Sequence, residues 1–146
     1  MSDKAIEAGA WVLEHGHRAL LKLSGGRFPK TVAGMQPVEL HTIGRKTGAR
    51  RTTMLTSPVQ YEGRVVLVAS KGGDDRDPQW YRNLTRNPDV EITIAGETKK
   101  MRARTASPEE KAALWPDIVA TYKGYASYQK RANRDIPVVI CEPRGA

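Results

Sequence analysis

The sequence predicts one α+β domain, mainly antiparallel β-sheet with helices at its periphery. Three observations support this fold class. Short runs in which apolar and polar residues alternate, separated by Gly, Pro and acidic residues, occupy the middle of the chain. Strand and helix patterns do not alternate as a βαβ fold of the Rossmann type requires. The chain has 146 residues, enough for one domain that buries a core without disulfides.

The first predicted element is an amphipathic helix over residues 4–23. Its apolar stripe includes Leu20, and charged residues occupy other positions. We expect the stripe to pack on its own domain. Peripheral contact with a membrane surface is the alternative, because Trp11 and flanking cations are also typical of interfacial helices. In either case we expect residues 1–35 to form a helix and a linker that precede the β-domain of residues 36–146.

Short strands are predicted to follow, over residues 37–43, 51–60, 64–70, 90–95, 97–105 and 137–141. Gly63 and Gly96 form the turns of two hairpins. Within 97–105, Lys100, Arg102 and Arg104 occupy alternate positions, which predicts a cationic face in contact with solvent. Five or six short antiparallel strands favour a small barrel or a half-open sheet.

A short helix is predicted to begin near Pro78 and to stop before Pro88. Three acids precede it: Asp74, Asp75 and Asp77. We expect them to cap the helix, because carboxylates accept hydrogen bonds from the free N–H groups of a first turn. A catalytic acid and base pair is the less favoured interpretation.

A longer helix is predicted to begin at Ser107, an N-cap residue whose capping box is completed by Glu110. Pro116 is expected to kink or end this helix. Three tyrosines then follow at three-residue spacing, which places them on one side of a helical segment. They are Tyr122, Tyr125 and Tyr128.

The chain is basic, with 24 Lys and Arg against 16 Asp and Glu. The charge is concentrated in residues 44–51, where four cations and two glycines occur without an acid. Such a loop predicts an anion site. Residues 70–73, Ser-Lys-Gly-Gly, repeat this chemistry after an apolar strand, so that one ligand can span both segments. Nucleic acid, an anionic membrane surface and a phosphorylated cofactor are the candidate partners.

Several other kinds of site are not supported. The three histidines have no metal-ligand spacing, so no metal site is predicted. The sequence has no Gly-x-Ser-x-Gly motif, which argues against a serine hydrolase. Cys141 follows an apolar run and is predicted to be a buried thiol in a reducing compartment. Because neither a signal peptide nor a long uncharged apolar segment is found, we expect a cytoplasmic protein.

Anion clamps and aromatic residues without a side-chain nucleophile are typical of a protein whose cofactor carries the reaction, and hydride transfer is the natural candidate. Trp80 and Tyr125 are candidate walls for a flavin-like ring, with strand backbone groups at its polar edge. The alternative for Trp80 is packing in the core. The alternative for the tyrosines is a packed aromatic stripe.

Five motifs occur in order along the chain: Thr42-Ile43-Gly44-Arg45-Lys46-Thr47-Gly48, Ser70-Lys71-Gly72-Gly73, Pro78-Gln79-Trp80-Tyr81-Arg82-Asn83-Leu84, Asn87-Pro88 and the triple tyrosine. Together they resemble the deazaflavin-dependent nitroreductase family, whose members use coenzyme F420. The resemblance covers roughly residues 36–143. It implies a split β-barrel of the flavin-reductase type, with residues 36–146 as the cofactor-binding domain.

The resemblance also implies roles for individual residues. The clamp for the phosphate and polyglutamate of the cofactor matches Arg45, Lys46, Thr47 and Arg51. The strand expected to run past the cofactor matches Thr52, Thr53, Met54, Leu55 and Thr56. The strand end at the edge of the deazaflavin matches Val68, Ala69, Ser70, Lys71, Gly72 and Gly73. The remaining cofactor contacts match Trp80, Asn83 and Tyr125.

The implied reaction is transfer of a hydride from reduced deazaflavin to an electron-poor acceptor, such as a quinone, a nitroaromatic or an enone. Tyr125 and Tyr128, with Tyr122 beside them, are candidates for orienting the acceptor or donating a proton. Asp77-Pro78 departs from the His-Pro pair that members often carry, which bears on the choice of substrate.

Two alternatives remain at this point: a split-barrel protein that binds FMN, and a basic module for nucleic acid or membranes. We expect a small-molecule acceptor rather than nucleic acid as the partner, and a monomer or homodimer.

Overall fold

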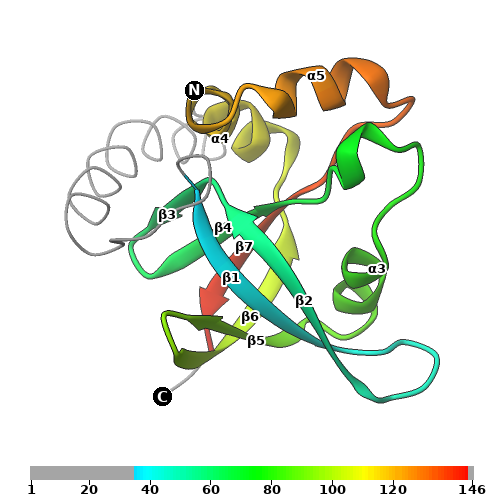
Figure 1. The fold of residues 1–146 in the computed structure, drawn as a ribbon, viewed down its shortest axis with the longest axis vertical. Helices are drawn as coiled ribbons and strands as arrows, with labels where there is room; N and C mark the ends of the chain where they lie inside the picture. The colour runs from blue at the N-terminus through cyan, green and yellow to red at the C-terminus, as the bar shows by residue number, and fades with distance from the viewer. Residues whose placement is uncertain (1–34, 145–146) are drawn as a thin grey trace.

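The computed structural model describes residues 35–144, which form one seven-stranded antiparallel sheet with helices packed against it (Figure 1). The strands are β1 Gln36–Ile43, β2 Arg50–Ser57, β3 Val59–Tyr61, β4 Arg64–Val68, β5 Asp89–Ile94, β6 Glu97–Thr105 and β7 Val138–Pro143. The described helices are the 3-10 turn η2 Lys71–Gly73, α3 Gln79–Arg86, α4 Pro108–Thr121 and α5 Gly124–Arg131. The strand order is β2-β1-β5-β6-β7-β4-β3.

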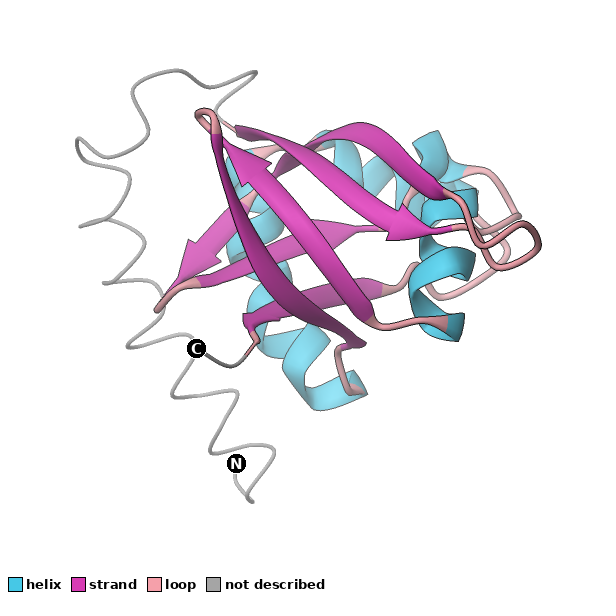
Figure 2. Cartoon of the chain, turned by 90° about the horizontal axis from the view of Figure 1, so that it is seen from below, coloured by secondary structure: helices cyan, strands magenta, loops and turns pink. Residues whose placement is uncertain are grey.

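The sheet curls into a half-barrel, which Figure 2 shows from below. Ser57, at the end of β2, closes the curl: its hydroxyl donates to the carbonyls of Val59 at 3.0 Å and of Val66 on β4 at 2.5 Å. Among residues 35–144, β2 forms a strand ladder with β1 alone, so its other edge is free along most of its length. The predicted fold class is confirmed.

Alternation along β4 divides the apolar residues between two cores. Val65 and Leu67 pack inside the half-barrel, where α3 covers one end. Val66 and Val68 point to the opposite face and pack against α4 and α5. Burying each such side chain contributes roughly 1.5–3 kcal/mol. Cys141 on β7 is also inside the half-barrel, as predicted, and burial raises the pKa of its thiol to about 12.

Two predicted elements need correction. The predicted strand 51–60 is two strands, because the chain bends at Pro58, which has no N–H to continue a ladder. Of the two outcomes predicted for Pro116, a kink or the end of the helix, the second is wrong, because α4 continues to Thr121. The helix continues because Leu114 and Ile118, on either side of the proline, are both buried in the outer core. The predicted helix over 4–23 lies outside the described residues.

The capping prediction for α4 is confirmed. The Ser107 hydroxyl accepts from the backbone N–H of Glu110 at 3.1 Å, and the Glu110 carboxylate accepts from the backbone N–H of Ser107 at 2.9 Å. Arg104 also donates to that carboxylate, at 2.8 and 2.9 Å. The start of α4 is therefore tied to β6, and this places the tyrosines that follow α4 beside the open edge of β2.

Candidate active site

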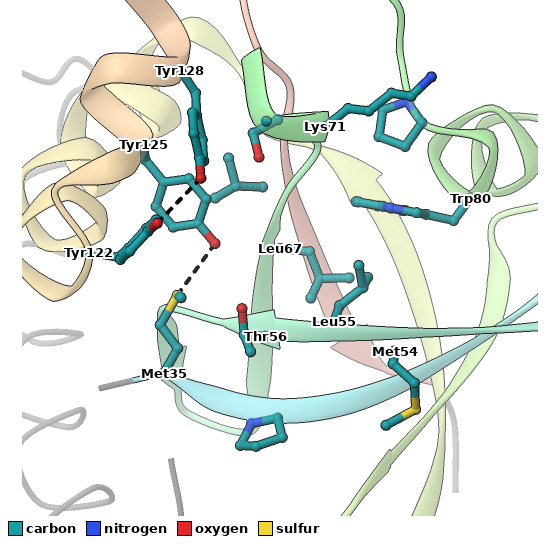
Figure 3. A pocket seen from close by; sticks show the side chains of 15 residues that line it. Met35, Met54, Leu55, Thr56, Leu67, Lys71, Trp80, Tyr122, Tyr125 and Tyr128 are labelled. Carbon is teal, nitrogen blue, oxygen red and sulfur yellow. Dashed lines mark hydrogen bonds between the residues drawn. The ribbon is translucent and has the colours of Figure 1, made fainter. Parts of the chain in front are cut away.

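A pocket of about 780 Å³ opens between β2, the end of β4 and the helices (Figure 3). Small-molecule sites typically measure roughly 300–1,000 Å³. It is lined by Met35, Pro37, Met54, Leu55, Thr56, Leu67, Val68, Ser70, Lys71, Gly72, Pro78, Trp80, Tyr122, Tyr125 and Tyr128. The tyrosines lie at one end and Trp80 at the other, with Leu55 and Thr56 of β2 along the wall between them. Most of the lining is apolar, which suits a planar organic ring.

The three tyrosines form one cluster. Tyr122 ends α4 and the others belong to α5, with ring centroids 5.2–6.2 Å apart. The hydroxyls of Tyr122 and Tyr128 are 3.3 Å apart, and that of Tyr125 donates to the Met35 sulfur at 3.4 Å. Burial raises the pKa of Tyr125, and the hydrogen bond with Tyr122 raises the pKa of Tyr128. Both phenols are thus weaker acids than usual and stay protonated at neutral pH.

The wall opposite β2 is held in place by Arg134, whose side chain is only 14% exposed. Its guanidinium donates to the carbonyls of Asp74 at 2.9 Å, Ala69 at 3.1 Å and Ser70 at 3.2 Å, and to the Asp77 carboxylate at 2.8 Å. One side chain therefore ties together the end of β4, the loop after η2 and the residue before Pro78. Nothing in the spacing of the sequence pointed to Arg134.

The loop after η2 also contacts α5 directly. A Cβ on Gly73, whose φ is +87°, would lie 3.2 Å from both the Cα and the carbonyl oxygen of Tyr128. The Asp75 carboxylate accepts from the backbone and side chain of Asn133 at 2.8 and 3.2 Å. Arg131 donates to the Gly72 carbonyl at 3.1 Å. The tyrosine helix and the 70–77 loop therefore form one packed unit.

The predicted role of the acidic cluster is wrong. The N-cap of α3 is Pro78, and no side chain caps this helix. Asp74 instead accepts from Arg76, and these hydrogen bonds lower the pKa of the carboxyl to about 2. Asp77 accepts from Arg134. The three acids therefore shape the loop by binding cations and amides from other segments.

The cationic loop between β1 and β2 is tight and lies beside α3. The Gly44 amide donates to the Ala49 carbonyl at 2.7 Å, and a Cβ on Gly44 would meet the Thr47 hydroxyl at 2.9 Å. Arg45 donates through its backbone and its guanidinium to the Asn83 side-chain oxygen, at 3.2 and 3.0 Å. The loop is therefore anchored on the same short helix that supplies Trp80 to the pocket.

Asn83 was predicted as a cofactor contact, but its side chain is used within the protein. The residue is 6% exposed, and its amide nitrogen donates to the Thr42 hydroxyl at 3.3 Å. Arg50 also has a protein partner, Glu91 on β5, at 2.6 Å. Within residues 35–144, Lys46, Arg51 and Lys71 make no ion pair. These three cations remain available to an anionic ligand.

The structure brings most of the predicted site together around the pocket. The predicted residues that line it are Met54, Leu55, Thr56, Val68, Ser70, Lys71, Gly72, Trp80, Tyr122, Tyr125 and Tyr128. The predicted residues outside its lining are Arg45, Lys46, Thr47, Arg51, Thr52, Thr53, Ala69, Gly73 and Asn83. Prediction missed Met35, Pro37, Leu67 and Pro78, although Leu67 and Pro78 lie next to or within segments that the resemblance had singled out. Trp80 is 7% exposed and packs in the core, as one prediction had it, and it also lines the pocket, where its role beside a ring stays a prediction.

Comparison with known proteins shows the family of this chain. Residues 14–143 match the family model of the F420H(2)-dependent quinone reductases. An F420H(2)-dependent quinone reductase of Mycobacterium tuberculosis is 39% identical over 132 residues, 88% of each chain. A putative F420H(2)-dependent quinone reductase of the same organism is 41% identical over 103 residues, covering 68% of this chain and 83% of the relative.

Solved structures agree as well. A structure of an F420-H2 dependent reductase (FDR-A) is 36% identical with a TM-score of 0.67, and the match covers 73% of this chain and 94% of that one. A structure described as a domain-swapped dimer is 33% identical with a TM-score of 0.68, covering 92% and 99%. The chain belongs to the F420H(2)-dependent quinone reductase family and is an F420-dependent oxidoreductase.

Proposed function

We propose that this chain reduces a quinone within the pocket between Trp80 and the tyrosine cluster, with reduced coenzyme F420 as the hydride source. One observation carries the proposal: an apolar pocket large enough for a ring and an acceptor lies along the same strand as a loop of unpaired cations. From Arg51 to Leu55 the extended strand spans about 13 Å. A ligand with a planar ring and an anionic tail fits this arrangement.

The residues present suit the cofactor. When bound, coenzyme F420 supplies a hydride from its deazaflavin ring. Lys46 and Arg51 would hold its phosphate and carboxylates, and Lys71 would meet a further anionic group at the pocket. The free edge of β2 offers backbone N–H and C=O groups to the polar edge of the ring. Leu55, Leu67 and Trp80, which line the pocket, would exclude water from the ring.

The tyrosines would orient the acceptor as neutral hydrogen-bond donors. Because the pKa values of Tyr125 and Tyr128 are raised, neither phenol gives up its proton easily. The Tyr125 hydroxyl bonds to the Met35 sulfur at 3.4 Å and the Tyr128 hydroxyl to a second phenol at 3.3 Å, which are long hydrogen bonds that a quinone carbonyl could replace. A donated hydrogen bond stabilises the negative charge that develops on the quinone oxygen during reduction.

The observed charges favour this function over the basic binding module. On β6, Arg102 pairs with Asp89 at 3.0 Å, and Arg104 pairs with Glu110 and Glu142. The cationic face predicted there is thus largely neutralised by carboxylates of the same molecule. FMN has a shorter anionic tail, which would leave the cations of the β1–β2 loop without a partner.

Membrane contact and the oligomeric state are separate questions from the reaction. Within residues 35–144, none of the helices has the length and apolar character needed to span a bilayer. The predicted membrane contact of residues 4–23 lies outside the described residues and stays a prediction. We propose a homodimer, since one similar structure is described as a domain-swapped dimer. Light scattering of the purified protein tests this.

The proposed reaction is tested by mixing the protein with reduced F420 and a quinone without oxygen. We expect the visible absorbance of oxidised F420 to return at a rate proportional to protein concentration. FMN in place of F420 is the control and should give neither tight binding nor turnover. Turnover with FMN alone, or binding of F420 without any reduction of quinones, would overturn the proposal.

A further inference from the structure

Most arginines of the described chain are paired with carboxylates of the same molecule. Ion pairs of 3.8 Å or less involve Arg50, Arg64, Arg76, Arg102, Arg104, Arg134 and Arg144. Within residues 35–144, the arginines outside these pairs are Arg45, Arg51, Arg82, Arg86 and Arg131. All but the last of these belong to the β1–β2 loop, the start of β2 or α3. The unneutralised arginines are therefore concentrated at one end of the molecule.

Arg82 and Arg86 occupy the same face of α3, because residues four apart are neighbours on a helix. Both are exposed, and α3 contains no acid. Two like charges at this spacing disfavour the helix. Arg86 has a local reason to be cationic, since it lies in the last turn, where a positive charge complements the helix dipole. Arg82 lies earlier in the helix and lacks this reason.

The arginine face of α3 adjoins the anion-binding loop. Asn83, which anchors Arg45 of that loop, directly follows Arg82 and is three residues from Arg86. Residues three apart on a helix have their Cβ atoms about 5–6 Å from each other. The cations of the loop and of α3 therefore lie on two segments that contact each other through Asn83, on the same helix that supplies Trp80 to the pocket.

We propose that Arg82 and Arg86 form a second anion subsite, which binds the outer carboxylates of an oligo-γ-glutamate tail. The inference rests on the proposed function, because that function places the phosphate and the first carboxylates on Lys46 and Arg51. A longer tail needs cations further from the pocket, and the arginine face of α3 supplies them. The subsite makes this protein selective for cofactor molecules with long tails.

The test is a titration of F420 fluorescence with two preparations of the cofactor, one with a single glutamate and one with five or more. The double variant Arg82→Gln/Arg86→Gln should bind the long-tailed form about 4–25-fold more weakly, because each exposed ion pair contributes about two- to fivefold. Its affinity for the single-glutamate form should change less than twofold. The difference should shrink in high salt, which screens exposed charges.

The matched control is Lys99→Gln/Lys100→Gln, which removes the same charge from exposed positions of β6. It should change neither affinity. Equal weakening of both cofactor forms, no weakening of either, or the same loss in the control would overturn the subsite.

A second measurement separates the subsite from the proposed function. The probe is a labelled penta-γ-glutamate, which has no ring, and its binding is measured by fluorescence anisotropy. It should bind the wild type in a salt-dependent way and bind the double variant more weakly. If the peptide binds in this way but F420 does not, the proposed function fails and the subsite stands. If F420 binds without regard to tail length and the peptide does not bind, the subsite fails and the proposed function stands.

Discussion

Replacing Arg134 by Gln should both destabilise the protein and loosen the cofactor site. The guanidinium satisfies the carbonyls of Ala69 and Ser70, which belong to residues only 0% and 8% exposed. A hydrogen bond from a charged donor contributes roughly 1.5–3 kcal/mol, and the two carbonyls share one nitrogen. We therefore expect a loss of about 3 kcal/mol in the free energy of unfolding. For a domain of this size this lowers the melting temperature by about 6–12 °C.

The assay compares thermal unfolding and F420 affinity in Arg134→Gln, Arg134→Lys and Arg76→Gln. Lysine keeps the charge but cannot reach the carbonyls and Asp77 at once, so it should restore only part of the stability. Arg76 is the matched control, since it pairs with Asp74 in the same loop but its side chain is 71% exposed. We expect this control to melt like the wild type. An Arg134→Gln protein with unchanged melting and unchanged cofactor affinity would refute the anchoring role.

Four further predictions concern the site and the core. Lys46→Ala should weaken F420 binding roughly tenfold or more in a fluorescence titration, because it removes one charge-assisted hydrogen bond. Unchanged affinity would count heavily against the cationic loop between β1 and β2 as the site of the phosphate and glutamate tail. Tyr125→Phe and Tyr128→Phe should lower quinone turnover while F420 binding persists, and full turnover in both would remove the orienting role. Folding raises the pKa of Tyr125 above its ordinary value of 10.0, so its contribution to the free energy of unfolding is present below pH 10 and is lost as pH rises through the folded-state pKa. In chemical unfolding experiments, the free energy of unfolding of the wild type should therefore fall above pH 10 more than that of Tyr125→Phe. Cys141 should not react with Ellman reagent at pH 8 until the protein is unfolded, since its thiol is buried with a pKa of about 12.

The sequence by itself determined the features that depend on residues close together in the chain. Alternation of apolar residues identified the strands, since successive side chains of a strand point to opposite faces. The capping box at Ser107 and Glu110 identified the start of α4, because both partners lie within one helical turn. The density of cations in residues 44–51 identified the loop that we propose binds anions, and the ordered motifs indicated the family that the comparisons then showed.

Only the tertiary structure decided which of these residues are free to bind a ligand. Arg50 pairs with Glu91, 41 positions along the chain, and Asn83 binds Arg45, 38 positions away. Arg134 reaches the carbonyl of Ala69 across 65 positions. Such pairs depend on how the sheet curls and where a loop packs. No pattern among neighbouring residues of the sequence indicates them. For this reason sequence patterns located the cationic loop and the tyrosines, whereas the fold decided that Arg50 is paired while Lys46, Arg51 and Lys71 make no ion pair within residues 35–144.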